Sequence, residues 1–433
     1  MTYILKNLGR LDNTFNSEIL IDLLNNSNPK IRYWSIKNLG KLKDQNLIDK
    51  FYSIAKHDES TEVRREAVSS IGRLRDQQIK KYLKDFLSDS DPKVIVQAIR
   101  GLLNFKNDDE VKTSLKKLVD HENEIIRDVI KKEFFSNNNT NDYEHHTEVN
   151  NILENVVVKG DVRDILNLIP DNSFHLTFTS PPYYNARDYS IYESYEKYLD
   201  FLKQVFSLTY GKTKEGRFLI VNTSPVIMPR VSRQHSSKRY PIPFDLHNEL
   251  DDIGWEFIDD IIWVKPEASV KNRTSGFNQH RKPLAYKPNA ITEYIMVYRK
   301  KSNKLIDWNI KQYNYETIEK SKVKGDYETN NVWKIDPSFD KVHSAVFPVE
   351  LCKRVIQYYS FEGDLVFDPF AGSGTFGRTS KALNRKFFLT EIKDEYFKYM
   401  QSLKKDNAIF KNSETKFYDF IEFKNKVNQN DSY

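Results

Sequence analysis

The chain has 433 residues, of which 39% are hydrophobic and 30% charged, so it is long enough for two domains and is not disordered as a whole. Its single cysteine, Cys352, excludes a disulfide framework, and no window approaches the ~20 apolar residues of a membrane span. The net charge of +6 is too small for this length to indicate a nucleic-acid partner, and the N-terminus does not resemble a secretory leader, so we expect a cytoplasmic protein without membrane association.

The first third of the chain, residues 1–135, repeats with a period of about 31 to 32 residues. Each repeat has a turn followed by a helix start, and the four starts lie at Asn28, Ser60, Asp91 and Asn123. These polar residues are typical N-caps, and the apolar residues that follow recur at helical spacing. The pattern resembles HEAT repeats, which predicts stacked helix pairs forming an all-α solenoid with a concave side.

The partner of these repeats is left open between two classes. A protein-docking scaffold is one, and an arc that lies along DNA is the other. Residues 1–135 contain 25 basic and 21 acidic residues. Because a face that follows phosphates usually needs a surplus of positive charge, this near balance slightly favours the scaffold.

A polar stretch, residues 136–150, follows the repeats and is predicted to be a linker. It contains His145 and His146, but no further histidine or cysteine lies at ligand spacing, so we expect no metal site. The second domain is then predicted to span residues 151–433.

Seven short β-rich runs alternate with helical stretches in this second domain. They predict a mostly parallel, seven-stranded, Rossmann-like α/β sheet covered by helices on both faces. The runs are residues 155–158, 176–179, 217–221, 260–264, 294–298, 364–367 and 386–389. Because ligands in such sheets bind beyond the carboxyl ends of strands, the residues after each run are candidate site residues.

A glycine-containing turn, Asp368–Thr375, follows one of these strands and precedes a predicted helix. Its glycines let the backbone approach a ligand, and amides at a helix start can bind an anionic group such as a carboxylate. Glu391 ends the next strand, where a carboxylate can accept both hydroxyls of a ribose. The combination predicts a site for a nucleoside that carries an amino-acid tail.

A second loop, Ser180-Pro181-Pro182-Tyr183, also follows a strand directly. Its prolines stiffen the loop and hold the Ser180 hydroxyl and the Pro181 carbonyl in place. These two acceptors would bind both N–H groups of an exocyclic base amine and direct its lone pair toward a sulfonium methyl, while Tyr183 stacks on the base. Such a base must first be extruded from the duplex.

Together these motifs resemble the β group of DNA amino-methyltransferases, in which the catalytic loop precedes the cofactor loop; the resemblance covers about residues 155–399. It implies S-adenosyl-L-methionine as cofactor, Asp161 at its adenine and Phe347 at its methionine part. The implied catalytic residues are Ser180, Pro181, Pro182 and Tyr183. The implied cofactor-binding residues are Asp161, Phe347, Asp368, Pro369, Phe370, Ala371, Gly372, Ser373, Gly374, Thr375 and Glu391.

Within that family, serine in the first catalytic position is typical of N4-cytosine enzymes, whereas adenine enzymes mostly carry aspartate. N4-cytosine is therefore favoured, and N6-adenine is the alternative. C5-cytosine methylation needs a thiolate, but Cys352 lies in an apolar helical stretch and is expected to be buried and inert. An inactive repeat scaffold is a further alternative, against which the intact motifs argue.

Residues 228–301, between the two motifs, carry a basic cluster and are the expected target-recognition part of the domain. The resemblance implies double-stranded DNA as substrate and a restriction endonuclease as a partner. A homodimer and the recognition sequence are left open. The candidate DNA contacts are Lys271, Arg273, Arg281, Lys282 and Lys287.

Overall fold

The computed structural model describes two compact units, Met1–Asn139 and Thr140–Tyr433, which we call the repeat unit and the catalytic unit. Among the helices it describes, none combines the length and apolar character needed to cross a membrane. The described residues are 1–11, 15–135, 146–185, 192–228, 230–232, 234–270, 281–284, 286, 288–338, 346–406 and 415–430.

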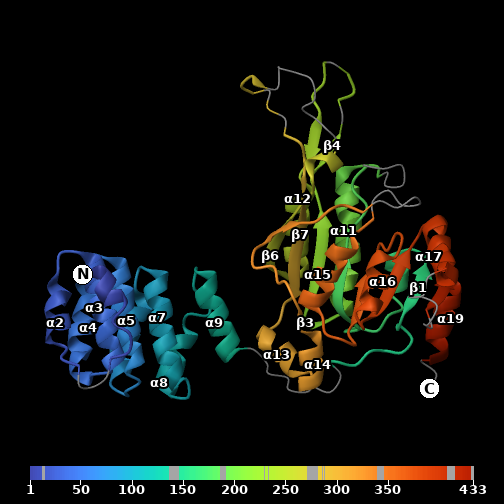
Figure 1. Cartoon of the computed structure of the whole chain (residues 1–433). Helices are drawn as coiled ribbons and strands as arrows, with labels where there is room; N and C mark the ends of the chain where they lie inside the picture. The colour runs from blue at the N-terminus through green and yellow to red at the C-terminus, as the bar shows by residue number, and fades with distance from the viewer. Residues whose placement is uncertain are drawn as a thin grey trace. The chain divides into compact units, whose positions relative to one another are not determined.

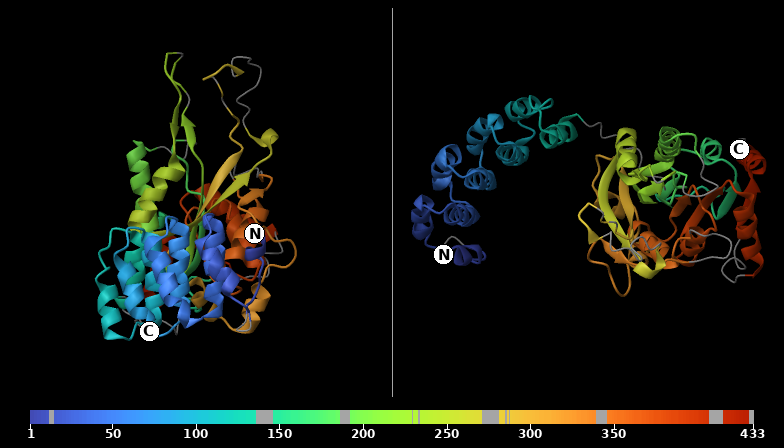
Figure 2. Two further views of the ribbon diagram at one scale, coloured as in Figure 1. Left: turned by 90° about the vertical axis from the view of Figure 1, so that its left-hand side faces the viewer. Right: turned by 90° about the horizontal axis from the view of Figure 1, so that it is seen from above.

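The repeat unit consists of helices stacked in two layers (Figures 1 and 2). Three of its described α-helices are directly followed by a 3-10 turn. The α-helices are α1 (Thr2–Lys6), α2 (Glu18–Asp22), α3 (Pro29–Leu42), α4 (Ile48–His57), α5 (Thr61–Arg73), α6 (Ile79–Lys84), α7 (Pro92–Leu102), α8 (Asp109–Lys116) and α9 (Glu124–Phe134).

Polar side chains cap three of the four predicted repeat helices. The Asn28, Asp91 and Asn123 side chains accept hydrogen bonds from the backbone amides of the first turns of α3, α7 and α9. Ser60 precedes α5 at the expected N-cap position, but its side chain makes no capping hydrogen bond. The position of this N-cap is therefore as predicted, and the predicted side-chain bond is absent. The backbone of Ser60 still accepts the first helical hydrogen bond, from Arg64.

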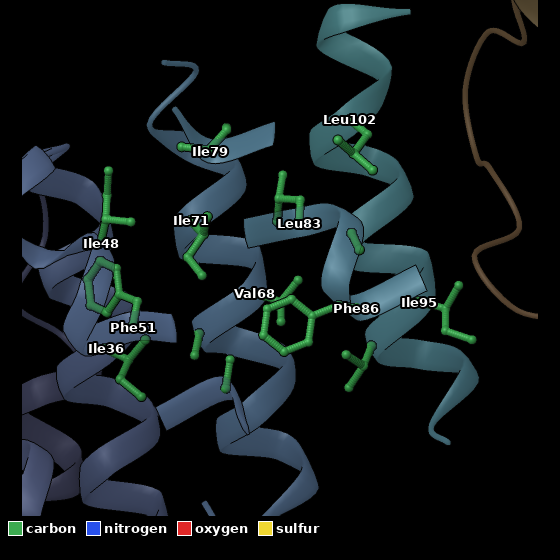
Figure 3. Close-up of a cluster of buried hydrophobic side chains, with 14 of the residues drawn as sticks. Ile36, Ile48, Phe51, Val68, Ile71, Ile79, Leu83, Phe86, Ile95 and Leu102 are labelled. Atoms are coloured by element: carbon green, nitrogen blue, oxygen red, sulfur yellow. The ribbon is translucent and has the colours of Figure 1, made fainter. Parts of the chain in front are cut away.

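Glycines at the contacts between successive repeat helices let these helices approach closely. A Cβ atom on Gly40 would lie 2.5 Å from Ser70 Oγ, and one on Gly101 would lie 3.1 Å from the Gly72 Cα. The apolar faces of the helices merge into one core that includes Ile36, Phe51, Val68, Phe86 and Leu102 (Figure 3). One repeat alone could not bury such a face, so the stack is the stable unit.

The catalytic unit is built on a nine-stranded sheet with the order β11-β1-β10-β9-β2-β3-β7-β6-β8. The mostly parallel sheet is confirmed: among the described strands of this sheet, only β7 runs antiparallel to its neighbours, β3 and β6. The strands are β1 (Val156–Lys159), β2 (Phe174–Thr179), β3 (Thr213–Thr223), β6 (Trp255–Val264), β7 (Thr292–Lys300), β8 (Val332–Lys334), β9 (Leu365–Asp368), β10 (Lys386–Glu391) and β11 (Lys416–Asp419).

All seven strands expected from the sequence are present, but the count of seven is wrong. The two additional strands, β8 and β11, lie at the two edges of the sheet. They are only three and four residues long, and neither is fully buried, so neither shows a buried apolar run. Edge strands of this length give almost no periodic signal.

Helices cover both faces of the sheet (Figures 1 and 2). Alternate residues of the strands point to opposite faces, so Val366 packs toward one helix layer and Phe367 toward the other. One layer holds α15 (Val349–Tyr359), α16 (Thr375–Ala382) and α17 (Asp394–Asp406). The other holds α10 (Val162–Leu166), α11 (Tyr195–Lys212), α12 (Ile242–Ile253) and α19 (Phe420–Asn430).

The amino-terminal part of the catalytic unit is anchored at the amino-terminal end of the central strand β2, whereas the loops described below lie at the carboxyl ends of the strands. The backbone carbonyl of His146 lies 3.1 Å from His175 Nε2, and the His146 ring packs against Trp308 of α13 (Ile306–Lys311), the helix that precedes α14 (Tyr315–Ser321). His146 is only 6% exposed. His146, which the composition assigns to the linker, thus packs on the catalytic unit.

Candidate active site

A cavity of about 500 Å³ lies beyond the carboxyl ends of β1, β2, β9 and β10. Its volume is within the usual range for small-molecule sites. It is lined by the four predicted catalytic residues and by every predicted cofactor residue except Gly374. The structure thus brings together two loops that are almost 190 residues apart in the sequence.

The loop Ser180–Tyr183 leaves β2 at the wall of this cavity. The next residue, Tyr184, is buried against the rings of Tyr195, Tyr198 and Tyr240, at centroid distances of 5.3, 5.7 and 4.8 Å. This aromatic cluster fixes the far end of the loop, while β2 fixes its start. The loop is therefore held on both sides, as preorganised acceptors require.

Three polar residues that the sequence analysis missed line the cavity beside this loop: Asn222, Lys265 and Glu293. The Tyr183 hydroxyl donates to Glu293 Oε2 at 3.0 Å, and Asn222 Nδ2 donates to the same oxygen at 2.6 Å. The Lys265 ammonium forms an ion pair with Glu293 Oε1. The Glu293 carboxylate thus binds one cavity residue from each of three segments: the catalytic loop, β3 and the end of β6.

Simple strand rules explain why these residues were missed. Lys265 directly follows the strand β6, so the rule that located the two loops could have found it. Glu293 lies at the start of β7, which is antiparallel, so an amino-terminal strand end meets the cavity there. Nothing in the sequence of that strand signals its direction.

Burial and neighbouring groups shift the ionisation of the catalytic loop. The pKa of Tyr183 is raised well above its ordinary value, first because the ring is buried and also because the negative Glu293 is adjacent. The phenol is therefore neutral and acts as a hydrogen-bond donor. Its ring orientation is fixed by the bond to Glu293.

Asp368 is the buried acid at the start of the cofactor loop, where it is 1% exposed. Its Oδ1 accepts hydrogen bonds from Thr179 Oγ1 at 2.7 Å and from the Phe370 amide at 3.0 Å. Burial raises the pKa of Asp368 to about 7, against the opposing effect of those two donors. A cation placed beside this carboxyl would restore its charge.

The turn between β9 and α16 needs glycine for two different reasons. Gly372 has φ 54° and donates its amide to Glu391 Oε2 at 2.8 Å. Gly374 has φ 76°, and a Cβ there would lie 2.6 Å from the Met400 sulfur. Gly374 therefore lies on the side of the turn that faces Met400, which explains why it does not line the cavity.

Glu391 ends β10 with its carboxylate fixed in orientation. The amides of Gly372 and Lys393 donate to its two oxygens, each at 2.8 Å. Burial raises the pKa of Glu391, and these amides act in the opposite direction. Each oxygen keeps a lone pair for a further donor such as a ribose hydroxyl.

The two remaining predicted cofactor residues lie at other parts of the cavity wall. Asp161 caps α10, and its carboxylate pairs with Arg163 at 2.7 Å, which lowers the pKa of Asp161. Phe347 stacks on Phe178 at a centroid distance of 4.5 Å. Phe347 therefore presents an apolar surface against the same strand that leads into the catalytic loop.

Of the predicted DNA contacts, Arg281 and Lys282 are exposed, and Lys271, Arg273 and Lys287 lie outside the described residues. A two-stranded ribbon, β4 (Val226–Met228) and β5 (Lys238–Tyr240), follows β3 and extends beyond the main sheet (Figure 1). It leaves from the same edge as the catalytic loop, and its Lys238 and Arg239 are exposed.

Two other expectations concern metal and thiol chemistry. Within the described part of the chain, no group of three or more histidine, cysteine, aspartate or glutamate residues is arranged to hold a metal ion. Cys352 is buried on α15, as expected, and burial raises the pKa of its thiol. A thiol in this environment is not a thiolate nucleophile at neutral pH.

Comparison with known proteins gives two family matches. A family model described as DNA methylase matches residues 174–402, just over half of the chain. A model for HEAT repeats matches residues 48–131. The second match agrees with the repeats recognised in the sequence.

Individual relatives cover mainly the catalytic unit. The type II beta methyltransferase M.BslI of Bacillus sp. (strain NEB-606) is 27% identical over 63% of this chain, but the match spans only 30% of that protein. The type II methyltransferase M.Cfr9I of Citrobacter freundii is 27% identical over 58% of this chain and 88% of its own length. A putative DNA modification methylase of Thermus thermophilus, solved with S-adenosyl-L-methionine, is 24% identical, with a TM-score of 0.48 over 61% of this chain and 98% of that one.

Proposed function

This chain belongs to the DNA methylase family, and from that premise we propose that it transfers the methyl group of S-adenosyl-L-methionine to N4 of cytosine in double-stranded DNA. The observation that supports this most directly is the convergence of two loops on one cavity. Ser180–Tyr183 forms one side of it and Asp368–Thr375 the other. A methyl donor and an acceptor amine bound to these loops would be neighbours.

The groups of the cofactor loop fit a nucleoside with an amino-acid tail. S-adenosyl-L-methionine supplies a methyl group activated by its positive sulfur. Asp368 would face the ammonium of the tail, because a buried carboxyl gains most from a cation. Glu391 would accept the ribose hydroxyls, Phe347 would pack against the methionine chain and Asp161 would lie at the adenine.

The catalytic loop would act on the extruded base. Ser180 Oγ and the Pro181 carbonyl accept the two amine hydrogens, and Pro182 keeps the loop rigid. Tyr183 stacks on the base in an orientation set by Glu293. As the N–C bond forms, the S–C bond breaks, and the amine then loses one proton to solvent.

N4 of cytosine is proposed over N6 of adenine because Ser180 is a neutral acceptor in the position where adenine enzymes mostly carry a carboxylate. Two donors, Asn222 Nδ2 and Lys265 Nζ, line the same cavity. They suit a pyrimidine that presents a ring nitrogen and a carbonyl oxygen beside its amine. N6-adenine methylation remains the second candidate, since the two loops serve either base.

The product decides between these bases. DNA free of methylated bases is incubated with the protein and isotopically labelled S-adenosyl-L-methionine, then digested to nucleosides and analysed by mass. We expect labelled N4-methylcytidine as the deoxynucleoside. Labelled N6-methyladenine would instead support the second candidate. An Asp368→Ala variant is the control, because any label that it still incorporates does not depend on this site.

The biological setting is also part of the proposal. Several relatives are named type II methyltransferases, a name associated with restriction and modification. We infer that residues 228–301 read the target sequence and that a restriction endonuclease recognises the same sequence. Sequencing the methylated positions in DNA from cells that express the protein tests whether the modification is site-specific.

A further inference from the structure

The repeat unit contains a groove that the methyl transfer does not use. Its volume is about 680 Å³, and it runs along α3, α5 and α7 with α1 at one end. Its charged lining consists of five cations, Lys6, Lys30, Arg65, Arg73 and Arg100, and two acids, Glu62 and Glu66. The near balance of charge over residues 1–135 is therefore not preserved in the groove.

Several acids of the repeat unit form ion pairs outside the groove. Lysines of the other helix layer pair with acids of the next repeat: Lys56 with Asp85 at 4.0 Å and Lys80 with Asp108 at 2.6 Å. Lys84 pairs with Glu110 in the same way. These contacts hold neighbouring repeats together.

The groove keeps positive charge that has no such partner. Arg73 pairs with Glu66 at 2.8 Å, and Arg65 pairs with Asp91 at 2.7 Å. Lys6, Lys30 and Arg100 are exposed and form no ion pair with any described residue. Of the two acids in the lining, Glu62 likewise has no ion-pair partner among the residues that the structure describes.

Further cations lie on α3 beside the groove, among them Lys37 and Lys41. Lys41 lies on α3, and its pKa is lowered first by burial and then by the charges of Lys37 and Arg73. The Lys37 ammonium lies 4.8 Å from the ring centre of Trp34, which lines the groove. Cations thus crowd this face closely enough to affect one another.

We propose that this groove binds the phosphate backbone of double-stranded DNA. Adjacent packed helices lie about 8–10 Å apart, so cations on α3, α5 and α7 span roughly 20 Å, the length of about six base pairs. Lys6, Lys30 and Arg100, which form no ion pair with a described residue, contact phosphates, while Tyr33 and Trp34 add aromatic surface to the lining. The inference rests on the DNA substrate proposed above and holds whichever base amine is methylated.

The test uses the full-length chain and a salt titration of DNA binding. A groove variant combines Lys6→Gln, Lys30→Gln and Arg100→Gln. Its matched control removes the same charge from exposed lysines at the other helix layer, through Lys50→Gln, Lys112→Gln and Lys117→Gln. Fluorescence anisotropy with a long labelled duplex gives log affinity against log salt for each.

Loss of three phosphate contacts should reduce the salt slope of the groove variant by about 2.7 and weaken binding at least about tenfold at low salt. The control should keep the native slope. Glu62→Gln should tighten binding, because it removes a repulsive charge from the groove. The groove variant should show a raised KM for DNA with kcat unchanged at saturating DNA.

Two outcomes would overturn the proposal. An unchanged slope in the groove variant would exclude phosphate contacts there and leave an acidic protein as the occupant. An equal loss in groove variant and control would show only the effect of total charge. Failure of the proposed function is seen separately, since the nucleoside product of the reaction does not enter the salt slope.

Discussion

Thr179 donates a 2.7 Å hydrogen bond to Asp368, and this bond joins the strand of the catalytic loop to the strand of the cofactor loop. Both residues are buried, and their strands β2 and β9 are neighbours in the sheet. The Thr179 hydroxyl favours the charged form of the Asp368 carboxyl and lowers its pKa, although burial still raises the pKa of Asp368 to about 7. Thr179, the residue before Ser180, therefore lowers the pKa of Asp368, the residue proposed to bind the ammonium group of the cofactor.

The first prediction is a pH dependence of cofactor binding. Asp368 is protonated below about pH 7 in the free protein, and a bound ammonium requires its carboxylate. Affinity for S-adenosyl-L-methionine should be highest between about pH 7 and the pKa of the ligand's own amine, about 8, and should fall about tenfold per pH unit below pH 7. Calorimetry across this range measures the profile.

A matched pair of variants separates this cause from general acid sensitivity. Thr179→Val removes a donor that lowers the pKa of Asp368, so the fall in affinity should move to higher pH. Asp368→Asn should bind weakly and without this pH dependence. A native-like profile in Asp368→Asn would show that another group controls binding.

The second prediction separates cofactor binding from chemistry in the catalytic loop. Ser180→Ala removes one acceptor for the amine but leaves the cofactor loop intact, so cofactor affinity should stay within about twofold and kcat should fall about 100-fold or more. Single-turnover methylation of duplex DNA measures the chemical step. Native turnover in this variant would contradict the role given to Ser180.

The sequence was sufficient to locate the two loops because parallel strands make their carboxyl ends recognisable. Where a buried apolar run is followed by Ser180 or by Asp368, the residue after the run marks the carboxyl end of the strand, which is where ligands bind in a parallel sheet. Glu293 could not be found in this way, since it lies at the start of an antiparallel strand. The polar cluster of the site therefore becomes visible only when β7 is placed beside β3.

Charge in the repeats shows the same limit. Counting residues 1–135 gives near neutrality, but the lining of the groove contains five cations and only two acids. Which charges are paired depends on contacts between repeats about 30 residues apart. Composition averages over both layers and so hides the positive groove.

The third prediction concerns the close approach of repeat helices. A Cβ on Gly101 would lie 2.5 Å from Leu83 Cδ1 and 3.1 Å from the Gly72 Cα, and the backbone of Gly72 cannot simply move away. Gly101→Ala should therefore destabilise the repeat unit by about 1–3 kcal/mol, despite the better helix propensity of alanine. Thermal unfolding followed by circular dichroism measures the change.

Gly211 provides the control for this substitution. It also lies in a helix, α11, but its Cβ would have only Asp171 Oδ1 near it, at 3.7 Å. Gly211→Ala should leave stability unchanged or raise it by up to about 1 kcal/mol. If both variants lost stability equally, the tight packing between α5 and α7 would not be the cause.

The last prediction tests whether Glu293 positions Tyr183. The Tyr183 hydroxyl donates to Glu293 at 3.0 Å, and the same carboxylate holds Asn222 and Lys265. Tyr183→Phe keeps the stacking ring but loses this bond, and Glu293→Gln weakens the whole cluster. Each should lower kcat with little effect on cofactor affinity, and rates of the double variant should deviate from additivity by about 0.5–3 kcal/mol, because both changes break one interaction. Purely additive effects would mean that the two residues act independently, and Tyr183→Ala, which also loses the ring, should be slower than Tyr183→Phe if stacking on the base contributes separately.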